Sequence, residues 1–334
     1  MKRRIRISDL AEGIEVISVI GLEKNTGKTV VLNQMLKEFR ENGTTAGVTS
    51  TGLEGEKRDQ VYLNEKPEIT LSRGTYFVTS ERDFRHRSFS ATVIDLRDYR
   101  SPLGRTVFAR AEADGKVIIS GPSILEYLSE AVNTMRSYGC EKILIDGSTS
   151  RISPGTPLVS DGVILATGAA LSMNLEELCR KTSFVVRLLS LPGTELELHK
   201  RIAPLGTGLW VEKDGVFERL SPSPLTAKSL KHELAGRTIY INGSLTSSVL
   251  LALAEKNTRI ILKDFSRVFF DELTLAKYER AGGHLEVLHP THLIAVTVNP
   301  LAPNGFKIQS DKLIKSLESK IDVPVLDVLE ESSN

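Results

Sequence analysis

Two apolar stretches near the start of the chain flank a segment in which apolar residues recur at helical spacing. The first covers 16–20 and the second 45–51, and each has the length of a strand. Between them the helically spaced apolar residues are Val31, Leu32, Met35, Leu36 and Phe39. Gly43 stands where such a helix would end. The pattern predicts strand 16–21, helix 28–41 and strand 45–51, which is the crossover that parallel strands require.

In two later stretches the alternation of predicted strands and helices is interrupted. From 61 to 120 short apolar runs alternate with turn residues, which is typical of β-structure. The stretch 193–237 contains a predicted hairpin over 209–217, whose turn is Lys213-Asp214-Gly215. The alternation returns at predicted helices 126–138 and 311–320 and at predicted strands 142–146, 163–167, 238–242, 260–263, 292–299 and 323–328.

The segment Gly21-Leu22-Glu23-Lys24-Asn25-Thr26-Gly27-Lys28-Thr29 joins the first predicted strand to the first predicted helix. Its Gly-Lys-Thr end and its place between strand and helix are typical of a phosphate-binding loop, although Leu22 stands where the usual loop has its first glycine. Main-chain N–H groups of such a loop and the positive end of the helix dipole bind an anion. The alternative is an ordinary turn that Gly27 eases.

The loop pattern assigns a role to each residue at the helix start. We expect Lys28 to contact the β- and γ-phosphates and the Thr29 hydroxyl to hold Mg²⁺. The predicted nucleotide-binding residues here are Asn25, Thr26, Gly27, Lys28, Thr29 and Val30. Lys24 is one position out of register with the extra lysine of the deviant loop in dimeric ATPases of the Min/Par type.

Acidic residues follow two of the predicted strands, where a carboxylate could hold Mg²⁺ or activate water. Asp146 ends an apolar strand and is the candidate metal ligand, with a turn-capping Asp as the alternative. Glu54, Glu56 and Asp59 follow the second strand, and Asp59 is the preferred member; a solvated charged loop is the alternative there. The predicted catalytic residues are therefore Lys28, Asp146 and Asp59, and the predicted metal ligands are Thr29 and Asp146.

Asn299 ends a late strand and stands directly before Pro300. Its side chain has both a donor and an acceptor, which suits recognition of a purine edge, although an Asn before Pro is also common in turns. A further set of polar residues lies between two predicted strands and either lines the site or forms a switch segment; the alternative is loop side chains that hold the fold or a partner. These residues are Ser150, Arg151, Ser153 and Asp161.

Composition limits the class of protein. The 334 residues carry a net charge of +1 and are 40% apolar, which supports a substantial core and argues against a protein that mainly binds nucleic acid. The basic residues 2–6 are interpreted as a solvated terminus, and no run is as long as a membrane span. Cys140 and Cys179 lack metal-ligand spacing, and His289 and His292 are interpreted as loop and strand-start residues. We expect a reduced, cytoplasmic protein.

The loop and the strand pattern together predict an α/β fold of the P-loop NTPase type, a doubly wound and mostly parallel sheet with two partly β insertions. The predicted division is 1–60 for the first part of this domain, 61–125 for a β-rich insertion, 126–182 for its continuation, 183–237 for a small insertion with a hairpin, and 238–330 for its completion.

Four segments occur together in the order in which one family carries them. They are the loop 21–29, Ile145-Asp146-Gly147-Ser148-Thr149-Ser150-Arg151, Asp161-Gly162-Val163-Ile164-Leu165-Ala166-Thr167-Gly168-Ala169 and Val296-Thr297-Val298-Asn299-Pro300. With them the chain resembles a reactivase subunit of adenosylcobalamin-dependent lysine 5,6-aminomutase, and 101–104 and 120–123 fit the same family. More distantly, 298–300 and 323–328 are similar to the last two strands of dethiobiotin synthetase and cobyrinate synthase, in which an Asn at this place reads adenine.

The resemblance implies an ATPase that opens a radical enzyme so that damaged cobalamin can leave. It implies ATP and Mg²⁺ as cofactors, held by Lys28, Thr29 and Asp146. The implied partners are lysine 5,6-aminomutase or the related ornithine 4,5-aminomutase and a second, MutS-like ATPase subunit, with no nucleic acid and no membrane. Two other functions stay open. One is an ATP-dependent synthetase, with Arg58 or Arg151 facing the γ-phosphate; the other is a subunit that binds nucleotide without hydrolysing it.

Overall fold

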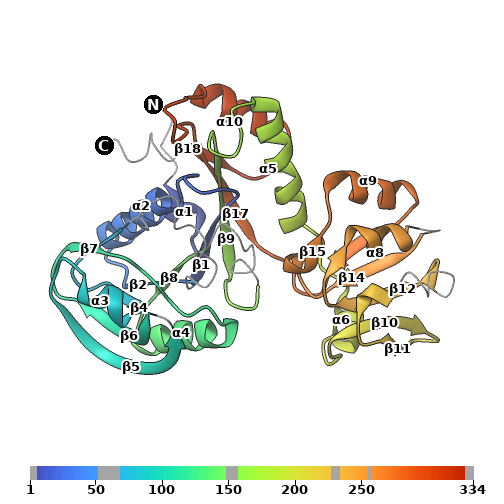
Figure 1. Ribbon diagram of the computed structural model, residues 1–334, viewed down its shortest axis with the longest axis horizontal. Helices are drawn as coiled ribbons and strands as arrows, with labels where there is room; N and C mark the ends of the chain where they lie inside the picture. The colour runs from blue at the N-terminus through green and yellow to red at the C-terminus, as the bar shows by residue number, and fades with distance from the viewer. Residues whose placement is uncertain are drawn as a thin grey trace. The chain divides into compact units, whose positions relative to one another are not determined.

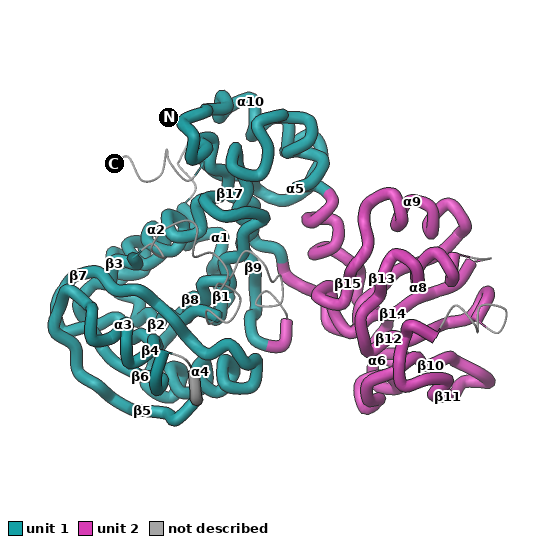
Figure 2. Tube along the Cα trace, viewed as in Figure 1, with its two compact units in different colours: residues 1–155, 159–183, 293–334 teal, residues 156–158, 184–292 magenta. Residues whose placement is uncertain are grey.

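The computed structural model describes residues 6–51, 68–101, 103–147, 157–226, 234–254 and 257–327. It is a mixed α/β structure whose main sheet is largely parallel (Figure 1). The chain divides into two compact units (Figure 2). The first contains 1–155, 159–183 and 293–334, and the second contains 156–158 and 184–292.

The first unit is built on a sheet whose described strands have the order β18-β17-β9-β1-β8-β2-β4-β6-β5. Neighbours from β18 to β4 are parallel, and β6 and β5 extend the sheet in antiparallel fashion. The strands are β1 (Val16–Gly21), β2 (Ala46–Ser50), β4 (Tyr76–Ser80), β5 (Ala91–Ser101), β6 (Gly104–Ala111), β8 (Lys142–Asp146), β9 (Gly162–Gly168), β17 (Leu293–Asn299) and β18 (Val325–Asp327). A separate antiparallel pair is formed by β3 (Ile69–Leu71) and β7 (Gly115–Val117).

Helices cover both faces of this sheet. On β8, Leu144 packs in the core that contains α2 (Lys28–Glu41), whereas Ile143 and Ile145 pack in the core that contains α4 (Leu125–Ser137). Successive side chains of a strand point to opposite faces, so the two helices lie on opposite sides, as in a doubly wound sheet. The other helices of the unit are α1 (Ile7–Leu10), α3 (Glu81–Arg85) and α10 (Ser310–Glu318), and α5 (Leu175–Leu189) continues into the second unit.

Helix α2 has the predicted bounds, and the hydrogen bonds that follow its last residue explain where it ends. Gly43 has a φ of 70°, and its N–H donates to the carbonyl of Arg40 while that of Thr44 donates to the carbonyl of Phe39. This pair of bonds satisfies the last carbonyl groups of the helix and requires a left-handed residue after the cap. The predicted role of Gly43 is confirmed.

The second unit has its own sheet, with the order β11-β10-β12-β14-β16. The last three strands are parallel, and β10 and β11 form an antiparallel hairpin. Its elements are α6 (Leu196–Ile202), β10 (Gly208–Lys213), β11 (Val216–Ser221), β12 (Thr238–Asn242), β13 (Leu245–Thr246), α8 (Ser247–Ala252), β14 (Arg259–Leu262), the 3₁₀ helix η3 (Phe265–Arg267), β15 (Val268–Phe269), α9 (Glu272–Arg280) and β16 (His284–Val287). The predicted hairpin is confirmed, and its turn residues Asp214 and Gly215 both have positive φ.

The expected division of the chain needs correction after residue 237. Residues 238–292 do not complete the first sheet, because β12, β14 and β16 pair with one another and with β10 in the second unit; only residues from 293 onward return to the first. Buried parallel strands have similar apolar sequences, so the hydrophobic pattern locates each strand without identifying its neighbours. The described residues between 68 and 125 are β-rich as expected for the stretch 61–125, but β4, β5 and β6 extend the main sheet.

Candidate functional site

The connection between β1 and α2 folds back on itself. Residues 22–27 link the end of β1 to the start of α2. The N–H of Leu22 donates to the carbonyl of Ala166 on β9 at 3.0 Å, which extends the strand pairing by one residue. The buried Thr26 hydroxyl donates to the carbonyl of Glu23 at 2.9 Å. The sequence therefore closes a compact loop with a side chain of its own.

Two residues of this loop have left-handed backbone conformations. Asn25 has a φ of 62° and Gly27 has a φ of 94°, and Gly27 is the residue from which α2 begins. Glycine and asparagine tolerate this region best among the amino acids. Gly27 lets the chain turn sharply into the helix without a side chain above the first turn.

The Lys28 side chain returns across the end of β1. A Cβ atom built on Gly21 would lie 2.8 Å from Lys28 Nζ, 2.9 Å from Lys28 Cδ and 2.7 Å from Thr26 Oγ1. Any larger residue at position 21 would therefore displace the lysine or the threonine. Gly21 makes room for an ammonium group beside the loop, although it stands one residue earlier than the first glycine of the usual motif.

The start of α2 is electropositive. Its first turn contains no acidic residue, whereas the first turns of α4, α5, α9 and α10 each contain at least one. The N–H groups of a first helical turn, here including those of Thr29 and Val30, have no partner within the helix. Together with the helix dipole and the Lys28 ammonium, they suit a bound anion such as a phosphate.

Asp146 lies on the strand next to β1 and on the same face of the sheet as α2. It is in register with Val19 of β1 and Ser50 of β2, and 8% of its surface is exposed. Its side chain points to the face that Leu144 shares, because the two residues are separated by two positions on one strand. The start of α2, which carries Thr29, and Asp146 therefore lie at the same edge and on the same face of the sheet, and their role as metal ligands stays a prediction.

Asn299 also reaches the loop, from the end of β17. Its Nδ2 donates to the main-chain carbonyl of Asn25 at 3.0 Å, and its Oδ1 accepts the N–H of Leu301 at 3.0 Å. Recognition of a purine edge by this side chain stays a prediction. The contact with the loop itself was not foreseen, because it joins residues 274 positions apart.

Several residues singled out in the sequence lie outside the described part of the structure. Asp59, Glu54, Glu56 and Arg58 fall within 52–67, and Ser150, Arg151 and Ser153 fall within 148–156. Asp161 is described, and the idea that it lines the site is wrong. Its Oδ2 accepts the N–H of Val16 at 2.9 Å, at the start of β1, so it lies at the opposite edge of the sheet from the loop.

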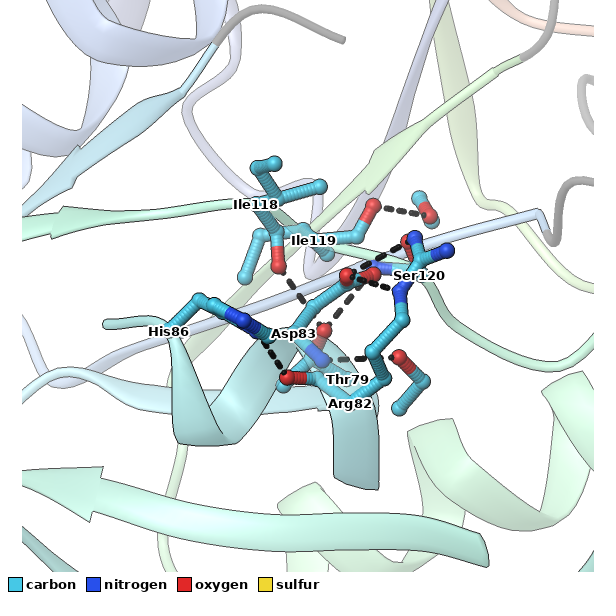
Figure 3. A network of polar contacts seen from close by, with 9 residues as sticks. Thr79, Arg82, Asp83, His86, Ile118, Ile119 and Ser120 are labelled. Carbon is cyan, nitrogen blue, oxygen red and sulfur yellow. Dashed lines mark hydrogen bonds and ion pairs between the residues drawn. The ribbon is translucent and has the colours of Figure 1, made fainter. Parts of the chain in front are cut away.

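A network of hydroxyl groups at the ends of β2 and β4 was missed from the sequence (Figure 3). Ser50 Oγ donates to the carbonyl of Ile119 and accepts the N–H of Gly121, while Thr79 Oγ1 donates to the carbonyl of Ile118 and accepts the N–H of Ser120. The two hydroxyls thereby fix the segment 118–121 at the carboxyl edge of the sheet. Asp83, buried nearby on α3, pairs with Arg82 at 2.9 Å. The network could have been expected from the sequence, because β2 and β4 both end in hydroxyl residues.

The cysteines do not offer a reactive thiol. Burial raises the pKa of Cys140 to about 12 and also raises the pKa of Cys179. A thiol with a raised pKa is protonated at neutral pH and is a poor nucleophile. Within the described ranges, no three or more His, Cys, Asp or Glu side chains are grouped so that they could hold a metal ion.

None of the helices in the described residues is both long enough and apolar enough to cross a membrane. Comparison with protein-family models, curated proteins and solved structures finds no match to this chain.

Proposed function

We propose that the first unit is a P-loop NTPase domain that binds Mg-ATP between β1 and α2. The observation that carries this proposal is the Lys28 side chain, which folds back over Gly21 at the start of an electropositive helix. Strand, left-handed glycine, lysine and helix N-terminus are then combined at the carboxyl edge of a parallel sheet, which is where ligands bind in such sheets.

The chemistry of the site follows from these groups. The Lys28 ammonium offsets negative charge on the β- and γ-phosphates, and the main chain from Asn25 to Val30 cradles the phosphate oxygens. The Thr29 hydroxyl and the Asp146 carboxylate are the oxygen ligands that suit Mg²⁺, a hard cation that neutralises phosphate charge when it is bound. Asp59, which lies outside the described residues, is the proposed group that positions the attacking water.

We further propose that the chain is the ATP-binding subunit of a reactivase for an adenosylcobalamin-dependent aminomutase of the lysine 5,6- or ornithine 4,5-type, acting in the cytoplasm. This assignment is supported by the ordered set of sequence motifs. ATP would favour one conformer of the complex over another, and hydrolysis would reverse that preference, so that the closed mutase opens and damaged cobalamin leaves. A second, MutS-like ATPase subunit completes the assembly.

The test loads the aminomutase with an inactive cobalamin and adds the full chain with Mg-ATP, with and without the second subunit. Cofactor release and phosphate production are followed together. We expect coupled release that Lys28→Ala abolishes. Lys37→Ala, on the exposed side of the same helix, should leave it unchanged and is the matched control.

Three outcomes would contradict the reactivase assignment in different ways. Phosphate production that is indifferent to the mutase would leave an ATPase of another function. Formation of an acyl phosphate or a ligated product would indicate a synthetase. Tight ATP binding without phosphate release, even with both partners present, would indicate a non-hydrolysing nucleotide-gated subunit.

A further inference from the structure

The Asn299 side chain is held at both ends of its amide. Nδ2 donates to the carbonyl of Asn25 in the loop, and Oδ1 accepts the N–H of Leu301 in the turn that follows β17, each at 3.0 Å. A side chain with both polar atoms engaged has a defined orientation. The contact ties the loop to a strand two positions away in the sheet, since β9 lies between β17 and β1.

The strand end that carries this side chain is itself tightly packed. The carbonyl of Asn299 accepts the N–H of Ala169 at 2.9 Å, and a Cβ atom built on Gly168 would lie 2.1 Å from that carbonyl oxygen. Only glycine allows this approach of β9 to β17. Asn299 therefore acts on the loop from a fixed point in the main sheet.

Fixing the Asn25 carbonyl also fixes the next main-chain donor. The described peptide bonds are all trans. In a trans peptide the carbonyl and the following N–H point in opposite directions, so a carbonyl aimed at Asn299 turns the Thr26 N–H away from it. Asn25 also has a φ of 62°, a conformation that costs a non-glycine residue energy and needs support from its surroundings.

We propose that Asn299 is a positioning residue for the phosphate loop, and that it contributes to the affinity for the polyphosphate part of any nucleotide. This inference rests on the proposed nucleotide site and adds to it. The Asn299 side-chain amide has a second N–H, which can still donate to the base of a nucleotide. The loop contact, by contrast, acts equally on ATP, GTP and inorganic tripolyphosphate.

The test compares Asn299→Ala with Asn304→Ala in the full chain. Asn304 Oδ1 accepts the N–H of Phe306 at 3.1 Å, which is the same local turn bond that Asn299 makes with Leu301, but no bond from Asn304 to the loop is described. Dissociation constants are measured for Mg-ATP, Mg-GTP and inorganic tripolyphosphate with Mg²⁺. We expect Asn299→Ala to weaken all three by about tenfold, as loss of one well-placed hydrogen bond allows, and Asn304→Ala to weaken none.

A loss confined to ATP, with unchanged affinity for tripolyphosphate, would overturn the positioning role and would favour base recognition alone. A second measurement needs no nucleotide. Hydrogen exchange of the peptide covering 22–30 should be faster in Asn299→Ala than in the wild type or in Asn304→Ala, and unchanged exchange would overturn the proposal. If the wild type bound neither nucleotide nor tripolyphosphate, the proposed function would fail, while the exchange result would still decide the role of Asn299.

Discussion

Each unit of this protein contains a strand, a loop and a helix in the order that a phosphate-binding loop uses, yet the two differ in chemistry. In the first unit β1 leads through left-handed Gly27 to Lys28 and a helix of 14 residues. In the second unit β12 leads to α8, a helix of 6 residues without a charged side chain. The same topology therefore does not by itself make an anion site.

The main chain of the two loops is used differently. The loop before α8 contains β13, whose residues pair with β15, so its backbone is engaged in a small sheet. The loop before α2 closes through the Thr26 hydroxyl and Asn299 instead, and Gly21 at the end of β1 leaves room for the Lys28 ammonium. Two glycines and one lysine, rather than the fold, therefore distinguish the candidate site.

The largest expected effect comes from removing the lysine. Lys28→Ala should weaken Mg-ATP binding by about 100-fold, because the ammonium interacts with charged phosphate oxygens. Lys263→Ala changes a lysine that follows β14 at the carboxyl edge of the second sheet, and it should leave affinity unchanged. Titration calorimetry measures both. Equal losses of Mg-ATP affinity in the two variants would contradict the proposal that only the edge of the first sheet binds the nucleotide.

The second largest effect distinguishes two buried carboxylates, Asp146 of the first unit and Asp264 of the second. Asp146→Asn should weaken ATP binding by about tenfold in Mg²⁺ and little in a chelator, since a neutral amide is a poor ligand for Mg²⁺. Asp264 of the second unit accepts the N–H of Ser266 at 2.9 Å and begins the 3₁₀ helix η3. Asp264→Ala should cost about 1 kcal/mol of stability through the lost cap, without a change in affinity. A Mg²⁺-independent loss in Asp146→Asn would argue against its role at the metal.

A smaller effect concerns the backbone at the two ends of α2. Gly27→Ala and Gly43→Ala each place a side chain at a positive φ, and each should lower the free energy of unfolding by about 1 kcal/mol. Only Gly27→Ala should also weaken nucleotide binding. Urea unfolding and nucleotide titration of both variants test this. A normal affinity in Gly27→Ala would mean that the left-handed turn does not shape the site.

The smallest effect is a pH dependence of the second unit. Burial lowers the pKa of His289, and His199 and Lys263 lower it further while Asp264 opposes them. The unfolded state, with an ordinary pKa of 6.5, then binds the proton more tightly than the folded state. The contribution of His289 to stability is therefore fully present above pH 6.5. It is lost as the pH falls from 6.5 toward the lower pKa of the folded state.

Fluorescence of Trp210, the only tryptophan of the chain, reports unfolding of this unit. His289→Gln should reduce the loss of stability on acidification, and His86→Gln, at an exposed position of the first unit, should not. If the free energy of unfolding of His289→Gln fell with acidification as steeply as that of the wild type, His289 would not be the cause of the pH dependence.

Local features of the sequence predicted the main part of the candidate site. The apolar run, the loop and the helical spacing located β1 and α2, and the end of an apolar strand located Asp146. These signals are local, because strand burial, helix spacing and caps depend on neighbouring residues. The contact between Asn299 and Asn25 and the place of Asp161 at the far edge depend on strand order, which the pattern does not encode.

The second unit shows the same limit on a larger scale. The strand 238–242 was located correctly in the sequence, but it was assigned to the wrong sheet. Its apolar residues are as buried as those of β1, and nothing in their composition distinguishes a strand of one parallel sheet from a strand of another. The hairpin β10–β11, by contrast, follows from a turn that the sequence specifies within a few residues.

The most direct test of the nucleotide site is hydrogen exchange of the full wild-type chain with and without saturating Mg-ATP. Protection should be strongest over 22–32, should be absent from 243–252 in the second unit, and should vanish in Lys28→Ala. Protection confined to the second unit, or no protection anywhere, would contradict the proposal that the loop between β1 and α2 binds the nucleotide.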